Sequence, residues 1–182
     1  LSFYRSIYSL YAHFIMFFPG GIGRKLRLFF WKRKLKFLGK NIFFDIGVDI
    51  TGCEKIYIGD NFILGRDCSI GSVLSDGVYI GNDVSIARGS YLHASNHKFS
   101  ELDVPINKQG VTHKSIKFKN INYSIVIEDD VWIGSNSVIL SGSHIGSGCV
   151  ISAGSVVSGF YPSYSIIIGN PARLAGSRKS NN

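Results

Sequence analysis

Cysteine is scarce in this sequence, with three residues among 182. Cys53, Cys68 and Cys149 are too few and too scattered to form a disulfide framework or a zinc cluster, so we expect no bound metal. A chain without disulfides is typical of a reducing compartment, and we expect a cytoplasmic location. Cys68 and Cys149 also fall at a small-residue position of the repeat described below, where they are expected to be buried apolar fillers.

Acidic residues are absent from the first 44 residues, although the whole chain carries 12. The same stretch holds nine of the 20 basic residues, namely Arg5, Arg24, Lys25, Arg27, Lys32, Arg33, Lys34, Lys36 and Lys40. The remaining 11 basic residues nearly balance the 12 acidic ones. The net charge of +8 therefore belongs to the N-terminal segment and not to the protein as a whole.

Long apolar runs are also missing. The run from Phe14 to Phe18 is far shorter than the ~20 predominantly apolar residues that a helix needs to span a bilayer. A secretory signal peptide is not expected either, because the basic cluster follows the apolar stretch and no small-residue cleavage site is evident.

Two interpretations of residues 1–44 remain open, and they are compatible with each other. The segment can form a pair of amphipathic helices that cap the core, with the lysines in solvent. It can also lie on an anionic membrane surface, where each Lys or Arg contributes ~1 kcal/mol. Nucleic acid is not expected as a partner, because no nucleic-acid-binding motif accompanies the basic residues.

A spacing of six residues organises the chain between Ile127 and Val157. Large apolar residues recur without a slip at Ile127, Ile133, Ile139, Ile145, Ile151 and Val157. Four positions after each of the first five stands a residue of small or modest volume, namely Val131, Ser137, Ser143, Cys149 and Ser155. A period of six excludes an α-helix and a long flat strand. It predicts short straight segments joined by tight turns, which stack into a parallel β-solenoid.

The same period appears earlier and is interrupted twice. It is clear at Ile58, Leu64 and Ile70, and again at Ile80, Ile86 and Leu92. The first interruption predicts four extra residues near 73–77, and the second predicts an excursion over residues 94–125. Loops of that length in a compact domain are uncommon and usually functional or disordered, and we interpret this one as functional. We divide the single domain into a basic, aromatic segment (1–44), a β-helix (45–160) with the loop 94–125, and a C-terminal strand and tail (161–182).

Three segments and the repeat together resemble one family. They are Ser95-Asn96-His97, the stretch 130–135 with the sequence Asp-Val-Trp-Ile-Gly-Ser, and the stretch 169–173 with the sequence Gly-Asn-Pro-Ala-Arg. With the hexads, they resemble the hexapeptide-repeat acyltransferases, most closely the small O-acetyltransferases that modify bacterial surface polysaccharides. The resemblance implies a left-handed parallel β-helix, an exception to the usual crossover rule. It also implies a homotrimer with active sites between subunits, and direct transfer of acetyl from acetyl-CoA to a sugar hydroxyl.

The resemblance assigns catalytic roles to His97 and Ser135. A sugar hydroxyl must lose its proton as it attacks the thioester, and histidine, with an ordinary pKa of ~6.5, suits a general base. His97 matches the position of that base. The attack creates an oxyanion that a backbone N–H can stabilise, and the N–H of Ser135 matches that donor. Trp132 is expected to form a wall of the site against the sugar or the pantetheine.

The cofactor positions follow by the same match. Gly134, Ala153 and Gly154 fall where family members pass the pantetheine along the coil, and Ser158 falls near the adenine. Arg173 matches a position that binds a CoA phosphate, for which a guanidinium is well shaped. Gly159 stands where relatives often carry a lysine, so phosphate binding relies on Arg173 with Arg178 or Lys179.

The acceptor side departs from the galactoside and maltose acetyltransferases, and we expect a different sugar. His113 and Asp76 are the candidates for contacts with the acceptor. We interpret His93 more simply as an ordinary residue of the solenoid surface or cleft. Three histidines could instead hold zinc, but the segments at 130–135 and 169–173 favour CoA over a metal. Transfer to a sugar amine or an antibiotic hydroxyl, and a non-catalytic scaffold, remain alternative interpretations.

Overall fold

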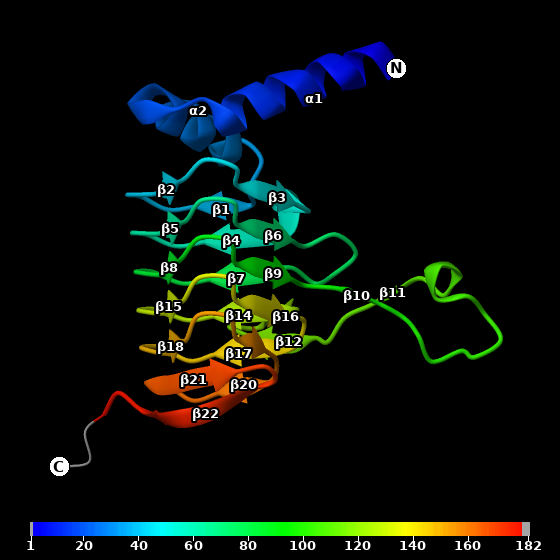
Figure 1. Ribbon diagram of the computed structural model, residues 1–182, viewed down its shortest axis with the longest axis vertical. Coiled ribbons are helices and arrows are strands. Elements are labelled where there is room, and N and C mark those ends of the chain that lie inside the picture. Colours follow the sequence, from blue (N-terminus) through cyan, green and yellow to red (C-terminus); the bar gives the residue numbers. More distant parts are fainter. Residues whose placement is uncertain (1, 180–182) are drawn as a thin grey trace.

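The computed structural model describes residues 2–179, with side chains from residue 10 onward. The chain forms a stack of parallel coils whose strands line up in three sheets (Figure 1). Sheet one contains β1 (Phe37–Leu38), β4 (Ile56–Ile58), β7 (Val78–Ile80), β14 (Ile125–Ile127), β17 (Ser143–Ile145) and β20 (Phe160–Tyr161). Sheet two contains β2 (Phe43–Phe44), β5 (Ile63–Leu64), β8 (Ser85–Ile86), β15 (Trp132–Ile133), β18 (Val150–Ile151), β21 (Ser165–Gly169) and β22 (Ala172–Ser177). Sheet three contains β3 (Asp49–Thr51), β6 (Ser69–Gly71), β9 (Tyr91–His93), β16 (Val138–Leu140) and β19 (Val156–Val157).

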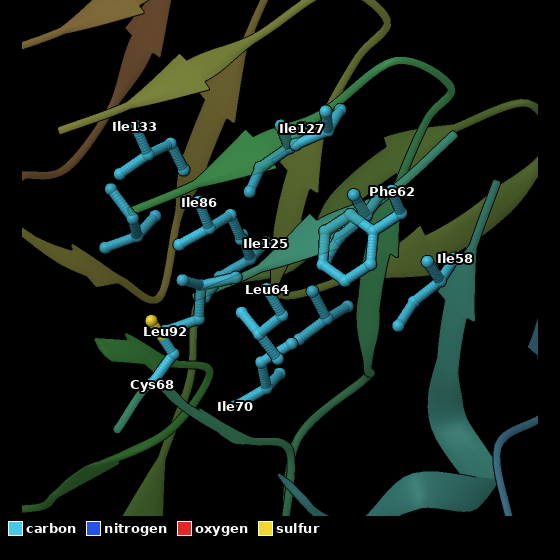
Figure 2. Close-up of a cluster of buried hydrophobic side chains, with 14 of the residues drawn as sticks. Ile58, Phe62, Leu64, Cys68, Ile70, Ile86, Leu92, Ile125, Ile127 and Ile133 are labelled. Atoms are coloured by element: carbon cyan, nitrogen blue, oxygen red, sulfur yellow. The ribbon is translucent and has the colours of Figure 1, made fainter. Parts of the chain in front are cut away.

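The six-residue period produces this stack because each short strand sends one large residue inward. Ile127 pairs with Ile145, Ile133 with Ile151 and Ile139 with Val157, so equivalent anchors of successive coils lie on top of one another. All six are fully buried. A close-up of the interior shows Ile127 and Ile133 together with anchors of earlier coils and with Cys68 (Figure 2). The predicted β-helix is therefore confirmed.

The small position of the hexad closes the corners between sheets. The buried hydroxyls of Ser137, Ser143 and Ser155 each donate a hydrogen bond to the carbonyl three residues back, at 2.7–2.8 Å. Cys68 and Cys149 fill the same position, and burial raises the pKa of both thiols. Both cysteines are therefore inert packing residues.

The first coil begins earlier than the sequence indicated. Leu38, Phe44 and Ile50 already follow the six-residue spacing, and β1 pairs in parallel with β4. The basic residues around Leu38 hid this repeat, and the 3₁₀ helix η1 (Cys53–Lys55) separates it from the next one.

Two helices, α1 (Ser2–Phe17) and α2 (Gly20–Lys32), cover the first coil (Figure 1). Ile15, Met16, Phe30 and Trp31 belong to the same buried cluster as the coil interior. Arg27 is 2% exposed, and its side chain donates hydrogen bonds to the carbonyls of Phe44 (3.1 Å), Phe18 (2.8 Å) and Met16 (3.4 Å). Burial lowers the pKa of Arg27, and nearby Asp45 partly opposes this. These bonds join both helices rigidly to the first coil. In the described part of the chain, neither helix is both long and apolar enough to cross a bilayer.

The excursion predicted between β9 and β14 is present and has two parts. The first is a ribbon of β10 (Asn96–His97) and β11 (Val111–Thr112), which projects from the coils and carries the 3₁₀ helix η2 (Ile106–Lys108) near its tip (Figure 1). The second is a hairpin of β12 (Ile116–Phe118) and β13 (Ile121–Tyr123). Tyr123 and Phe118 of this hairpin pack on Tyr79 and Val126 of sheet one and form a second, small core.

Candidate active site

His97 lies where the chain leaves sheet three. It lies four residues beyond the end of β9, pairs with Val111 across the β10–β11 ribbon, and is exposed to solvent. The base of the ribbon is fixed because the Ser95 hydroxyl donates a hydrogen bond of 2.9 Å to the Val73 carbonyl. Val73 belongs to the predicted insertion between β6 and β7. The insertion therefore supports the segment that carries the candidate base.

The structure brings together the two residues predicted to contact the acceptor. His113 Nε2 lies 3.2 Å from Asp76 Oδ1, and both side chains are about one-third exposed. The pairing of His97 with Val111 places His97 and His113 on the same face of the ribbon, as diagonal neighbours with about 7–8 Å between them. The backbone N–H of Asp76 donates to the Ser124 hydroxyl at 3.0 Å, which holds the insertion in place. Asp76 and His113 are thus in contact, and His97 lies on the strand that faces the one leading to His113.

His93 is the last residue of β9 in sheet three. Its ring stacks on Tyr91 with 5.0 Å between ring centroids, and its Nδ1 atom is buried without a hydrogen-bond partner in the described part of the chain. His144, by contrast, is held in a fixed contact on sheet one. Its Nε2 atom lies 2.7 Å from Glu128 Oε1, and Glu128 also accepts a 2.9 Å hydrogen bond from the Ser147 hydroxyl. Burial alone would raise the pKa of Glu128, but the bonds from His144 and Ser147 outweigh it and lower that pKa.

Ser135 stands at the corner between β15 and β16. The N–H groups of its neighbours Gly134 and Asn136 donate to the carbonyls of Ile151 and Arg88. Within the described residues, the N–H of Ser135 has no such partner. The equivalent N–H groups of Arg88 and Ala153 in the adjacent coils also lack a backbone acceptor among the described residues. A free N–H donor therefore recurs at this corner in successive coils. The corner therefore presents N–H groups that are available to an oxyanion.

Gly134 is required at this corner by close approach of the next coil. A Cβ atom at this position would lie 2.5 Å from the Ala153 nitrogen and 2.8 Å from the Ile151 oxygen. The glycine therefore allows the two coils to stack where the Ser135 N–H must be positioned.

Trp132 projects from the outer face of sheet two and is 56% exposed. Its strand neighbours are Ser85 and Val150. Ser85 is small, and a shallow hollow beside the indole is lined by Asp83, Ser85, Asp130, Val131, Trp132, Val150 and Arg178. Trp132 is thus free to contact a ligand, although no ring or side-chain partner is recorded for it within the described residues.

We call the corner between sheets two and three, with Ser135, Ala153 and Gly154, the Ser135 edge. The N–H of Gly154 donates to the Ser135 carbonyl at 2.8 Å, so these residues lie in adjacent coils. The edge continues to the end of β21, where the Gly169 N–H donates to the Ser155 hydroxyl at 3.1 Å. Arg173 pairs with Ile168 nearby and is exposed. Four of the residues predicted to contact CoA or the oxyanion therefore follow one edge.

His97 and Ser158 lie at a different corner, where sheet three ends. Val138 pairs with Tyr91 and Leu140 with His93, so Ser135 precedes the strands of sheet three and His97 follows them. At about 3.3 Å per residue, the two are on the order of 15 Å apart within one chain. Within one chain, His97 and Ser135 are therefore too far apart to act on the same reacting group.

Groups of three or more His, Cys, Asp and Glu side chains close enough to hold a metal ion do not occur in the described part of the chain.

Comparisons with known proteins identify the family of this chain. Sequence profiles described as "Bacterial transferase hexapeptide (six repeats)" and "Hexapeptide repeat of succinyl-transferase" match residues 124–159 and 55–94. An Escherichia coli protein named for O-acetyl transfer in lipopolysaccharide biosynthesis, WbbJ, is 30% identical over 138 residues, which cover 75% of this chain and 68% of that protein. A Mycobacterium tuberculosis protein named as an acetyltransferase, Rv3034c, is 34% identical over 125 residues, which cover 69% of this chain but 38% of that protein.

Solved structures show the same fold. A hexapeptide-repeat acetyltransferase of Vibrio cholerae, VCA0836, superposes with a TM-score of 0.69 at 26% identity, over 86% of this chain and 82% of that one. The same protein has also been solved in complex with acetyl coenzyme A, and that structure superposes with a TM-score of 0.68 at 26% identity, over 85% of this chain and 77% of that one. A galactoside acetyltransferase in complex with coenzyme A superposes with a TM-score of 0.72 over 92% of this chain and 77% of that one, although only 24% of residues are identical. The chain belongs to the hexapeptide-repeat acyltransferase family.

Proposed function

We propose that this protein is an acetyl-CoA-dependent O-acetyltransferase that acts on a sugar hydroxyl of a surface polysaccharide or its lipid-linked precursor. The observation that carries the proposal is the Ser135 edge, where a free backbone N–H continues into Ala153, Gly154 and Arg173. This order suits a thioester carbonyl at Ser135 and the remainder of CoA along the edge. The family membership and the acetyl coenzyme A complex of the V. cholerae relative support the same cofactor.

The proposed reaction uses His97 as a general base. His97 takes the proton of the acceptor hydroxyl as its oxygen attacks the thioester carbon. The carbonyl oxygen becomes an oxyanion that accepts a hydrogen bond from the Ser135 N–H. When the tetrahedral intermediate collapses, the C–S bond breaks, the acetyl ester remains on the sugar, and the CoA thiolate takes the proton back from His97. Gly134, Ala153, Gly154, Ser158 and Arg173 hold CoA, and Trp132 flanks the reacting groups.

We propose that His97 and Ser135 meet between copies of the chain in a homotrimer. Their positions at opposite ends of sheet three leave each corner with half of the site. The ribbon that carries His97 also projects beyond the coils (Figure 1). Phe99, Leu102 and Ile106 in its loop are exposed. A neighbouring copy would cover these side chains and complete the site.

The acceptor is proposed to contact Asp76 and His113, because these two side chains meet near the base of the ribbon that carries His97. The preference for a hydroxyl over an amine rests on the E. coli relative, whose name specifies O-acetyl transfer in lipopolysaccharide biosynthesis. The assay that tests this function measures CoA release from acetyl-CoA with a panel of oligosaccharides, lipid-linked sugars, amino sugars and a macrolide. Release that depends on an oligosaccharide or lipid-linked sugar is expected. Release only with an amino sugar or the macrolide would show that the acceptor is a sugar amine or an antibiotic hydroxyl. Failure to bind acetyl-CoA would refute the proposal that the protein is an acetyltransferase.

We also propose that the helical end contacts the cytoplasmic face of an anionic membrane peripherally. Exposed apolar side chains on α1 and α2, namely Leu10, Tyr11, Phe14, Phe17, Ile22 and Phe29, lie in a segment with basic residues and no acid. Such a surface combines apolar burial with attraction to anionic lipid.

Replacing Phe14 and Phe17 with serine is expected to lower binding to vesicles containing phosphatidylserine by about a hundredfold or more, because each of the two aromatic rings contributes ~1.5–3 kcal/mol when buried. Co-sedimentation with vesicles measures this. Phe99→Ser, on the ribbon tip, is the matched control and should bind as the wild type does. Unchanged binding of the helix variant would refute the membrane contact.

A further inference from the structure

Two arginines occupy the same position as Ser135 in the two preceding coils. The Arg66 carbonyl accepts a hydrogen bond from the Gly89 N–H at 2.9 Å, and the Arg88 carbonyl accepts one from the Asn136 N–H at 3.0 Å. The Ser135 carbonyl accepts the equivalent bond from Gly154. The three residues are therefore in register, about 4.8 Å apart per coil. The turns that carry them, between β5 and β6, β8 and β9, and β15 and β16, lie one above another (Figure 1).

Both guanidinium groups are free to bind a ligand. Arg66 and Arg88 are exposed, and neither has a hydrogen bond or ion pair from its side chain within the described residues. Arg27 and Arg178 differ, since the first binds backbone carbonyls inside the fold and the second binds Asp130 at 3.1 Å and the Gly148 carbonyl at 2.7 Å. The fold thus uses other arginines for structure and leaves these two unpaired.

Arg66, Arg88 and Ser135 form a column along the stack, and its two arginines lie away from the proposed CoA path. From Ser135 that path runs through Ala153 and Gly154 toward Arg173, at the C-terminal end of the stack. Arg88 and Arg66 lie on the opposite side of Ser135, one and two coils toward the helical end. A ligand that reaches them while reacting at Ser135 therefore approaches from the acceptor side.

We propose that Arg66 and Arg88 bind the diphosphate of a sugar diphosphate ester, so that the acceptor is an activated sugar and not a finished polymer. A guanidinium pairs bidentately with phosphate oxygens, and two of them one coil apart can each hold one phosphate. The separation of about 5–10 Å between Ser135 and the arginines leaves room for a sugar ring between the reacting hydroxyl and the phosphates. This inference rests on the proposed function, because Ser135 marks the reacting end.

The diphosphate ester can come from a nucleotide sugar or from a lipid-linked sugar, and the test separates the two. Protein saturated with CoA is titrated calorimetrically with inorganic diphosphate, UDP-glucose and farnesyl diphosphate, with free glucose and farnesol as matched compounds without phosphate. We expect the three diphosphates to bind and the two controls not to bind. Each of Arg66→Gln and Arg88→Gln should weaken diphosphate binding by about tenfold, as expected for one lost charge-assisted contact.

Lys40→Gln is the matched control, because Lys40 is an exposed basic residue at an equivalent turn on the edge between sheets one and two, where its carbonyl accepts the Asn61 N–H at 2.8 Å. It should leave diphosphate binding unchanged. Tighter binding of farnesyl diphosphate than of UDP-glucose would identify a lipid-linked acceptor, and the reverse order a nucleotide sugar. Either order supports the site.

Wild-type diphosphate affinity in a variant that combines Arg66→Gln with Arg88→Gln would overturn the proposal. A parallel loss of CoA affinity would also overturn it, because it would assign the arginines to CoA. If His97-dependent acetyl transfer to a sugar persists while diphosphate binding is absent, only this inference fails. If CoA does not bind, the proposed function fails instead.

Discussion

His97→Ala is expected to lower the rate of acetyl transfer by about 10²–10⁴-fold, the usual contribution of a positioned general base. His97 is exposed, and no hydrogen bond of its side chain contributes to the fold of the described chain. The substitution should therefore leave the thermal unfolding temperature and the affinity for acetyl-CoA unchanged. A loss in kcat with unchanged CoA binding is the signature of a group that acts in the transition state.

Lys98→Ala is the matched control, because Lys98 is the exposed next residue of the ribbon and its backbone N–H, which alanine retains, bonds to the Gly110 carbonyl at 3.1 Å. It should retain near-wild-type turnover. His113→Ala gives a further comparison, because loss of the contact with Asp76 should raise KM for the acceptor more than it lowers kcat. Near-wild-type kcat in His97→Ala would show that another group removes the proton.

Ser135→Pro is expected to lower kcat by about 10²–10³-fold, the cost of one oxyanion donor. Proline lacks the backbone N–H, and this N–H has no partner within the described chain, so the substitution removes no structural hydrogen bond. Ser135 is also not among the residues with positive φ, which proline could not adopt. The donor can thus be deleted with little change in the coil.

Ser135→Ala separates the backbone from the side chain. It removes the hydroxyl and keeps the N–H, and we expect it to react at nearly the wild-type rate. A circular dichroism spectrum and unfolding temperature close to the wild type confirm that Ser135→Pro retains the coil. If the alanine variant loses as much activity as the proline variant, the hydroxyl is the group that acts, and the backbone assignment is wrong.

The repeat predicts most of the fold because its physical cause is local. Each hexad buries one large residue and turns a corner, so the spacing of Ile127, Ile133 and Ile139 is sufficient to predict the coil. The first coil was harder to predict from the sequence, because lysines flank Leu38 in the chain. Part of the apolar surface of this coil is covered by Ile15 and Trp31 of the two helices and not by another coil.

The site is harder to predict from the sequence alone, because its contacts join segments that are distant along the chain. Asp76 and His113 are 37 positions apart, and only the ribbon and the insertion bring them together. Arg66 and Arg88 align with Ser135 only once the coil register is known, because the insertion and the excursion shift their spacing in the sequence. The separation of His97 from Ser135 likewise follows from which end of sheet three each one occupies.

We propose that His97 of one copy and the Ser135 N–H of another form one active site. The most direct measurement refolds His97→Ala and Ser135→Pro together and compares acetyl transfer with that of each variant alone. In mixed trimers about a quarter of the sites combine an intact His97 with an intact Ser135, so activity should return to about a quarter of the wild-type value. Activity that stays at the level of the separate variants would show that one chain supplies both groups, and would contradict the shared site.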